Sequence, residues 1–193
     1  MQNKTSEDEI TVIWQRIYKE WFGLEKDFSS LQIPDNYDPD KHFGVVVAEE
    51  LDTQSLIIAM EKKFSVRCRV VLFLEKYSAT DHDRTAVQGD YFVFFKKTIE
   101  ADEEFKNLSA KYLWKQKHQG ITLIERLLME VFYFETTQSH LDTNTRTLCC
   151  GSRDIDRSVP CVYYSLQHDC LMIDWEYKSF SSENSRSREF IVA

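Results

Sequence analysis

The first apolar pattern in the chain is typical of an amphipathic helix. Its apolar residues recur at spacings of three and four and are Ile10, Ile13, Trp14, Ile17 and Trp21. Residues at these spacings share one face of a helix, so the pattern predicts a helix with one buried face. Ser6 and Glu9 stand three residues apart before it and predict a capping box at its start. Gly23 predicts its end.

The next patterns predict a loop, a strand, a helix and two more strands. Residues 27–43 are rich in proline and aspartate and predict a loop, and the apolar run 44–48 predicts a buried strand. A helix should follow, capped by Asp52 or Thr53, with a buried face made of Leu56, Ile57, Met60 and Phe64. Strands are predicted at 67–74 and 91–97, and both are apolar on both faces.

A strand, a helix and a strand in this order suggest a β-α-β unit over residues 44–74. Such a unit places its strands side by side and parallel, with a right-handed crossover. Strands that are apolar on both faces occupy central positions in covered sheets, so we expect this of 67–74 and 91–97.

The second half predicts two helices and then a small sheet. A short helix should run from Ser109 to Gly120. Thr122 and Glu125 form a second capping box before a helix that buries Leu127, Leu128, Val131 and Phe132. Short strands at 148–150, 161–164 and 171–175 predict an antiparallel meander, and 190–192 predicts a last edge strand.

These elements together predict the α+β class, with a mixed β-α-β-β core, flanking helices and a small C-terminal antiparallel meander. The chain of 193 residues is the size of a single domain, and 1–98 and 99–193 are its possible lobes.

The amino-acid composition predicts a globular core and argues against a nucleic-acid partner. Apolar residues make up 42% of the chain and aromatic residues 13%, which is enough to build a core. The net charge of −8 repels phosphate backbones, and no dense basic cluster offsets it, so we expect no nucleic-acid partner.

Several kinds of site are missing from the sequence. The five glycines all stand alone, so neither common nucleotide-binding loop is present, and the GxSxG and HExxH motifs are absent as well. We therefore expect no cofactor. The acidic start lacks the apolar core of a secretory signal, and the longest apolar runs are too short to span a bilayer. With an odd number of cysteines, five, these features predict a cytoplasmic protein with reduced thiols and no membrane partner.

The stretch TLCCGSRDIDRSVPC, residues 147–161, contains the most chemistry. Its thiols could form a zinc site only from Cys149, Cys150, Cys161 and Cys170 with His168. The spacing lacks the tight pairs of structural zinc sites, so we expect no metal. Adjacent strand residues point to opposite faces, which predicts that one of Cys149 and Cys150 lies in the core and the other at the surface.

Two catalytic uses of these thiols are conceivable. A phosphatase loop needs an arginine six positions after its cysteine, and Asp156 stands there relative to Cys150. A couple between a thiol and His140 or His168 stays open, although inert thiols are the preferred interpretation.

The candidate ligand-binding residues of this stretch are Ser152, Arg153 and Asp156. A turn led by Gly151 would expose backbone amides, and the guanidinium of Arg153 matches a carboxylate or phosphate. The alternative is that Arg153 pairs with Asp154 or Asp156 across its own hairpin. The nearby sequence Asp81-His82-Asp83 is expected to be a solvated loop and not catalytic.

An ordered series of segments carries a resemblance over residues 40–193: DRTA at 83–86, EADEEFKNLSA at 100–110, the stretch 120–142, TLCCGSRDIDRSVP at 147–160 and the final SREFIVA. The series resembles a group of uncharacterised bacterial proteins with a block reading TLC-x-GSR-x-x-D-G-x-VP-x-V-x-W. The resemblance implies a bacterial source and no particular chemistry. It marks as motif positions Cys149, Gly151, Ser152, Arg153, Asp156, Val159 and Pro160.

The chain departs from that block at two positions. Arg157 stands where glycine is usual, and Tyr164 where tryptophan is usual. If the hairpin requires a positive φ at 157, arginine there costs on the order of 1 kcal/mol.

Two functions from different classes remain, and whether the protein is an enzyme stays open. The first is a non-catalytic protein that binds or regulates a protein partner, supported by the absence of catalytic motifs, the acidic charge and the many aromatic residues. The alternative is a small enzyme or ligand-binding domain for an anionic metabolite. Its site would combine Ser152, Arg153 and Asp156 with a nearby histidine.

Overall fold

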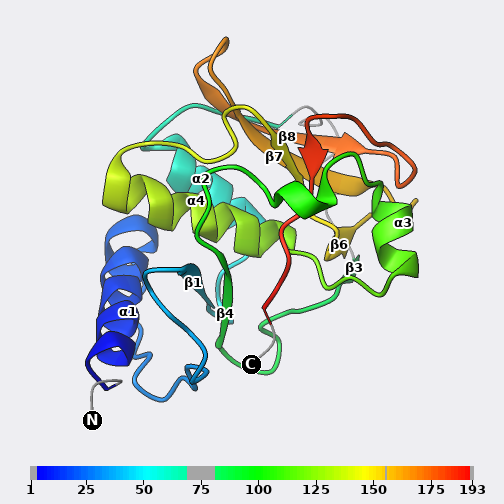
Figure 1. Cartoon of the computed structure of the whole chain (residues 1–193). Coiled ribbons are helices and arrows are strands. Elements are labelled where there is room, and N and C mark those ends of the chain that lie inside the picture. Colours follow the sequence, from blue (N-terminus) through cyan, green and yellow to red (C-terminus); the bar gives the residue numbers. More distant parts are fainter. Residues whose placement is uncertain (1–3, 69–80, 155, 192–193) are drawn as a thin grey trace.

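The computed structural model describes residues 4–68, 81–154 and 156–191. These residues form an α+β fold, as the sequence predicts (Figure 1). Its α-helices are α1 (Lys4–Ile17), α2 (Thr53–Glu61), α3 (Ala110–Lys115) and α4 (Leu123–Thr137). A π-helical turn (Tyr18–Phe22) extends α1, and a 3-10 turn (Glu103–Phe105) precedes α3.

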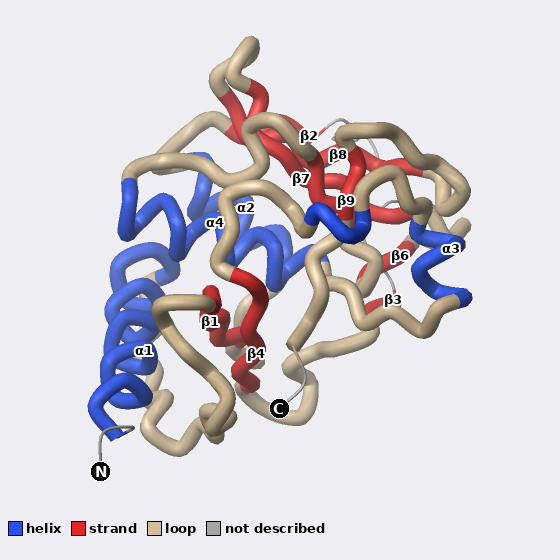
Figure 2. The backbone as a smooth tube through the Cα atoms, viewed as in Figure 1, coloured by secondary structure: helices blue, strands red, loops and turns tan. Residues whose placement is uncertain are grey.

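The strands of the described residues belong to three sheets. A mixed five-stranded sheet has the order β2-β8-β7-β5-β9, and two-stranded sheets are formed by β1 with β4 and by β3 with β6. The strand bounds are β1 (His42–Val47), β2 (Val66–Cys68), β3 (Asp81–His82), β4 (Tyr91–Lys96), β5 (Arg146–Leu148), β6 (Ser152–Arg153), β7 (Val159–Ser165), β8 (Cys170–Glu176) and β9 (Ser185–Arg186). In Figure 2, α1, α2 and α4 gather on one side of the molecule and the five-stranded sheet on the other.

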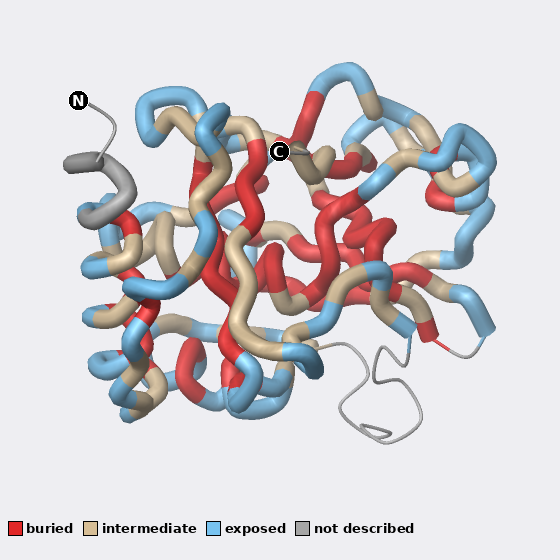
Figure 3. The backbone as a smooth tube through the Cα atoms, turned by 90° about the horizontal axis from the view of Figure 1, so that it is seen from below, coloured by how far each residue is buried: buried red, intermediate tan, exposed pale blue. Residues whose placement is uncertain are grey.

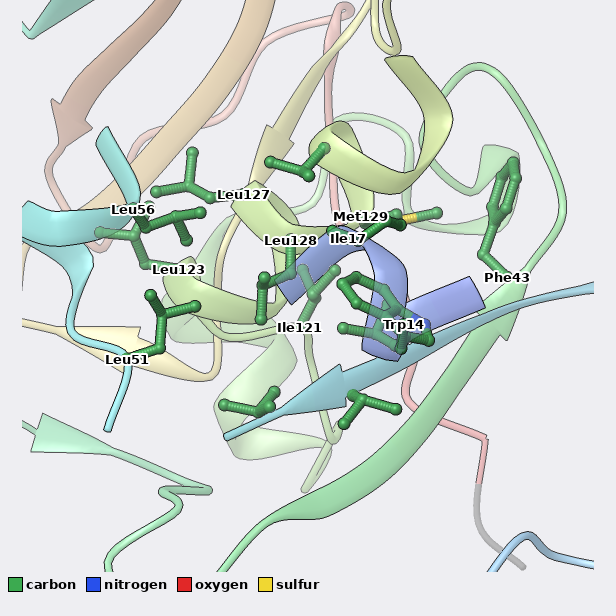
Figure 4. Close-up of a cluster of buried hydrophobic side chains, with 14 of the residues drawn as sticks. Trp14, Ile17, Phe43, Leu51, Leu56, Ile121, Leu123, Leu127, Leu128 and Met129 are labelled. Carbon is green, nitrogen blue, oxygen red and sulfur yellow. The ribbon is translucent and has the colours of Figure 1, made fainter. Parts of the chain in front are cut away.

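Helix α4 is the central element of the core. The predicted capping box is present, since Thr122 and Glu125 each bond the other's backbone amide, and good helix formers follow it. One apolar cluster connects α4 with α1, α2, β1, β7 and β8, so residues from both halves of the chain share a core (Figure 4). Figure 3 shows these buried segments in the middle of the molecule. The predicted stripe of the first helical segment is confirmed at Ile10, Trp14, Ile17 and Trp21, which are buried, whereas Ile13 is half-buried.

Helix α1 also satisfies the backbone of β1. An antiparallel strand bonds its neighbour only at alternate residues, so the other polar groups of β1 point away from β4. Trp14 donates its indole N–H to the Gly44 carbonyl at 3.0 Å. The Tyr18 hydroxyl donates to the Val46 carbonyl at 3.0 Å and accepts the Ala48 N–H at 2.9 Å. These bonds allow β1 to be buried beside a single partner strand, because a buried backbone group without a partner is costly.

The predicted β-α-β unit is wrong. Strand β1 pairs antiparallel with β4, whereas β2 pairs parallel with β8 in another sheet. In the described part of the chain β2 and β4 also lack the expected central positions, since β2 is at an edge of its sheet and β4 has one partner strand. Residues 69–74 of the predicted strand lie outside the described residues. The apolar character of β1 reflects the helices packed against it, whereas Phe92 and Phe94 of β4 pack on Tyr37 of the loop before β1.

Several element boundaries also differ. Helix α1 begins at Lys4, so Ser6 lies inside it and not at its start. Asp52 caps α2 and Gly23 ends the first helical segment with a φ of 70°, as predicted. Helix α3 ends at Lys115, before Gly120. The meander is confirmed as β5-β7-β8. The tail forms β9, parallel to β5, and the described residues Phe190 and Ile191 of the predicted last strand belong to no strand, while residue 192 lies outside the described residues.

Cys149 and Cys150 point to opposite faces, and both faces are covered. Cys149 belongs to the core around α4, and Cys150 belongs to a second cluster against α3. The expectation that one of them is at the surface is therefore wrong, since both are fully buried. The sheet at β5 is covered on both sides because α3 packs where the sequence suggested solvent.

A buried ionic network lies where α4, the 139–145 loop and the C-terminal segment meet. The side chains of Arg126, Glu130, Asp142 and Arg188 have no exposed surface. Asp142 accepts hydrogen bonds from Arg126 at 3.0 Å, from Arg188 at 2.8 Å and from Thr147 at 2.5 Å. Burial opposes the charge of Asp142, but the two arginines outweigh it and keep the pKa of this carboxyl below its usual range.

We predict that Asp142→Asn lowers the free energy of unfolding by about 3–5 kcal/mol, because it leaves two arginines with too little buried negative charge. Asp142 has a φ of 54°, which asparagine also tolerates, so the variant changes the charge and not the backbone preference. Urea denaturation measures the effect. A carboxyl whose pKa is lowered by folding stabilises above its unfolded pKa, so the difference should shrink as the pH falls below about 4.

Asp169→Asn is the matched control, since Asp169 also has a positive φ, 49°, but is exposed. Its carboxylate accepts the Tyr164 hydroxyl at 2.6 Å, and the amide oxygen of asparagine can accept the same bond. Its effect should stay within about 0.5 kcal/mol. Equal losses in the two variants would contradict the role given to the network.

We also predict that Arg157→Gly stabilises the protein. Arg157 has a φ of 62°, so this position of the turn has a left-handed conformation, which glycine adopts without strain. The gain should reach about 1 kcal/mol at most, because glycine also adds freedom to the unfolded chain. Arg157→Ala removes the same charge but keeps the Cβ atom. A gain in both variants, measured by urea denaturation, would show that charge and not backbone strain is responsible.

Candidate functional site

Strands β3 and β6 bring two segments of the sequence together in a short antiparallel pair, with His82 opposite Ser152 and Asp81 opposite Arg153. The Ser152 Oγ lies 2.8 Å from the His82 Nδ1, and it accepts the backbone N–H of Leu123 at 2.8 Å. Ser152 is fully buried. It therefore connects His82 to the first residue of α4 and holds the imidazole in one orientation.

Gly151 allows the chain to approach the start of α4 closely. A Cβ atom at this position would lie 2.6 Å from the Gly120 carbonyl oxygen and 3.0 Å from the Thr122 methyl group. A Cβ atom at Gly120 would in turn lie 2.8 Å from that of Cys150. The two glycines are needed here for backbone contact, and this contact places Ser152 at the helix.

We expected this turn to expose backbone amides to a ligand, but its amides already have partners within the chain. The amides of Cys150, Gly151 and Ser152 donate to the carbonyls of Leu148, Ile121 and Cys149. The Gly151 carbonyl accepts the N–H of Asp83 at 2.8 Å. The expected anion-binding turn is thus occupied by its own backbone bonds.

Arg153 pairs with carboxylates of the neighbouring strand. Its Nε donates to Asp81 at 2.6 Å, its Nη2 donates to Asp83, and its guanidinium lies 5.5 Å from the ring centre of Trp114. The expected partners Asp154 and Asp156 do not take this role. Asp154 is buried and accepts the N–H of Ser158, while Asp156 is exposed in the 154–158 turn.

The three sequence-predicted site residues therefore have different surroundings. Ser152 is buried behind His82, Arg153 lies over Trp114, and Asp156 faces solvent. The pocket beside them is lined by His82 and not by any of the three.

This pocket, which we call the His82 pocket, has a volume of about 420 Å³. It lies between the end of β1, the start of α2, the first turn of α4 and the loop after β3. Its apolar lining comes from Val47, Leu51, Ala86, Val87 and Ile124. Its polar lining comes from Glu49, Asp52, Thr53, Gln54, His82, Arg84 and Thr85.

Arg84 is held at the wall of this pocket by the start of α4. Its Nε and Nη2 donate to the two carboxylate oxygens of Glu125 at 2.8 Å, and Nη2 also donates to the Gly120 carbonyl at 2.7 Å. Burial works against the charge of Arg84, but Glu125 outweighs it and raises the pKa of the guanidinium. The Tyr91 hydroxyl donates to Glu125 at 3.0 Å. Burial, followed by the charge of Glu125, raises the pKa of Tyr91.

The thiols are poorly placed for reaction. Burial raises the pKa of Cys149 well above its usual value and that of Cys150 to about 12, so little thiolate forms near neutral pH. His140 contacts Glu130 at 2.9 Å and stacks on Tyr164 with ring centres 3.7 Å apart, and His168 is exposed. Over the described ranges, no three His, Cys, Asp or Glu side chains are grouped as metal ligands.

The chain matches no family model, and neither a curated protein nor a solved structure matches it. Among the helices of the described segments, none has the length and apolar character that crossing a membrane requires.

The sequence pattern points to Ser152 and to a nearby histidine, but it does not indicate His82 and Arg84 as the neighbours of this serine. Both lie in the DHDR segment, whose composition predicts a solvated loop. The one available signal is the segment DRTA at 83–86 in the resemblance. Nothing in the local pattern predicts that β3 pairs with a strand 70 residues later.

We predict that Ser152→Ala lowers the free energy of unfolding by about 1–3 kcal/mol, because the buried N–H of Leu123 loses its acceptor. The same change should shift the imidazole NMR signals of His82, since its Nδ1 partner is removed. Ser55→Ala, at an exposed position in α2, is the control. Unchanged His82 signals in Ser152→Ala would contradict the orienting role of Ser152.

Proposed function

We propose that this chain is a non-catalytic protein that binds a protein partner, and that the His82 pocket is the contact site. The observation that carries the proposal is the mixed lining of the pocket: Val47 and Leu51 are buried and form its apolar floor, whereas Glu49, Asp52 and Gln54 are exposed and form a polar rim. Val87 stands at this rim with 78% of its surface exposed. Protein interfaces combine such an apolar centre with a polar border.

The groups around the pocket support binding more than catalysis. A nucleophile must reach its substrate, but Ser152 is fully buried and its oxygen accepts the N–H of Leu123. Cys149 and Cys150 are buried too. Glu125 and Arg84 neutralise each other, which makes Glu125 a poor general base. His82 remains, and its hydrogen bond with Ser152 suits a fixed recognition group.

The alternative, a small enzyme or ligand-binding domain for an anionic metabolite, has one specific observation in its favour. The Ser152–His82 hydrogen bond resembles the arrangement that orients a catalytic histidine. Against it, an anion that reached Arg153 would have to displace both Asp81 and Asp83. We therefore rank it second.

The setting we propose is the bacterial cytoplasm. The bacterial source comes from the resemblance of residues 40–193. The five cysteines are free thiols, which is compatible with a reducing compartment. A net charge of −8 disfavours nucleic acid as the partner.

We predict that Ala86→Trp, which fills the pocket, and Val87→Asp, which places a charge at its rim, both abolish partner binding. Affinity capture from bacterial lysate followed by quantitative mass spectrometry measures this. Proteins retained by the parent should be lost with both variants, provided that circular dichroism shows unchanged folding. Leu166→Asp is the matched control, because Leu166 is 69% exposed at the turn between β7 and β8, away from the pocket lining.

Two results would count against the proposal. Equal capture by the parent and both pocket variants would remove the pocket from partner binding. Thermal stabilisation by an anionic metabolite that is lost in Arg153→Ala would favour the alternative, because a ligand stabilises only the state that it binds.

A further inference from the structure

We infer that the His82 pocket receives a lysine or arginine side chain from a basic segment of the partner. This inference rests on the proposed function and names the chemistry of the contact. It follows from three features of the described residues: the charge of the rim, the occupied helix ends and the apolar floor.

The rim carries more negative than positive charge. Glu49 and Asp52 line the pocket, and both are exposed. The positive charge of Arg84 is matched by Glu125 at 2.8 Å. An incoming cation therefore meets two carboxylates and one neutralised arginine, and the net charge of −8 attracts it over a longer distance.

Lys26, a cation outside the lining, is also neutralised. Lys26 contacts Glu50 at 2.7 Å and Asp90 at 3.1 Å, so it has two carboxylates for one ammonium group. Asp90 in addition accepts the backbone N–H of Glu49 at 2.9 Å. The negative excess thus extends from the pocket to the segment next to it.

Two helices begin at the pocket, and their positive ends would normally favour an anion. Both ends are already occupied by groups of this chain. Asp52 accepts the N–H of Ser55 at 2.7 Å at the start of α2. At the start of α4, Ser152 accepts the N–H of Leu123 and Glu125 accepts that of Thr122 at 2.7 Å. The amides at both helix starts therefore already have acceptors within the chain, so an anion gains few hydrogen bonds there.

The floor of the pocket suits the stem of a basic side chain. Val47, Leu51 and Ile124 provide an apolar surface below the carboxylates. Lysine and arginine bury their methylene groups on such a surface while the charged end stays near water. A volume of about 420 Å³ accommodates one side chain and part of its backbone. A short acidic side chain would fill less of the floor and would face Glu49.

A tethering competition tests this contact without knowledge of the partner. Val87→Cys places a thiol at the rim, and the protein is equilibrated with the disulfides of 5-aminopentanethiol, hexane-1-thiol and 5-mercaptopentanoic acid. Mass spectrometry measures how much of each of the three adducts forms on the variant and on the parent. The amount on the parent is subtracted, and the ratio of the three remainders describes the new thiol. The same mixture on Leu166→Cys gives the reference ratio for an exposed thiol.

We expect the amine to be enriched at position 87 by about fivefold for each carboxylate that it contacts. Asp52→Asn keeps the helix cap, because asparagine caps as well as aspartate. The double variant Asp52→Asn with Glu49→Gln should therefore return the adduct ratio at position 87 to the reference ratio. The control pair Asp35→Asn and Asp40→Asn removes the same charge at exposed positions outside the lining and should leave the enrichment in place.

The outcomes separate this inference from the proposed function. No amine enrichment, or enrichment of the carboxylate, overturns the inference, while loss of capture in Ala86→Trp would still support the proposed function. Amine enrichment with unchanged capture by Ala86→Trp overturns both, because the pocket would then bind small amines and not the partner. Enrichment that disappears in Asp35→Asn with Asp40→Asn also overturns the inference, since it would reflect only net charge.

Discussion

The fold depends on the balance of charge around Asp142. This carboxylate is fully buried between Arg126 of α4 and Arg188 of the C-terminal segment, and Glu130 supplies a second negative charge beside Arg126. Each buried ion is costly alone, so the three segments can be buried only together. Arg188 further donates to the carbonyls of Thr98 and Ile99, which connects the network to the segment that follows β4.

This network explains how a small mixed sheet and a pair of strands form one core. Helix α4 is buried on nearly all sides, and its polar residues can be tolerated because each has a partner within the fold. Arg126 and Glu130 face the loop that carries Asp142, while Glu125 faces Arg84 and the pocket. The same helix therefore stabilises the interior and positions one wall of the candidate site.

The site is assembled by contacts between distant segments. The close approach of Gly151 to Gly120 places Ser152 at the start of α4, and Ser152 in turn orients His82. The stretch 147–161, which contains most of the candidate reactive groups, thus does not line the pocket. It contributes through Ser152, which orients the lining residue His82. Its thiols are buried and Arg153 is paired with Asp81 and Asp83, which fits a structural role for this segment.

The sequence by itself determined the helices and the meander, because their signals are local. Thr122 and Glu125, three residues apart, form the capping box of α4. Gly23 has a positive φ and ends the first helical segment. The spacing of the apolar residues in α1 predicts its buried face. Outside the meander, which strands pair and which charges meet was decided only by the tertiary structure. The edge of β1 is satisfied by Trp14 and Tyr18, and His82 reaches Ser152 across 70 residues. Such contacts gain their energy from burial between distant segments, and local periodicity carries no information about them.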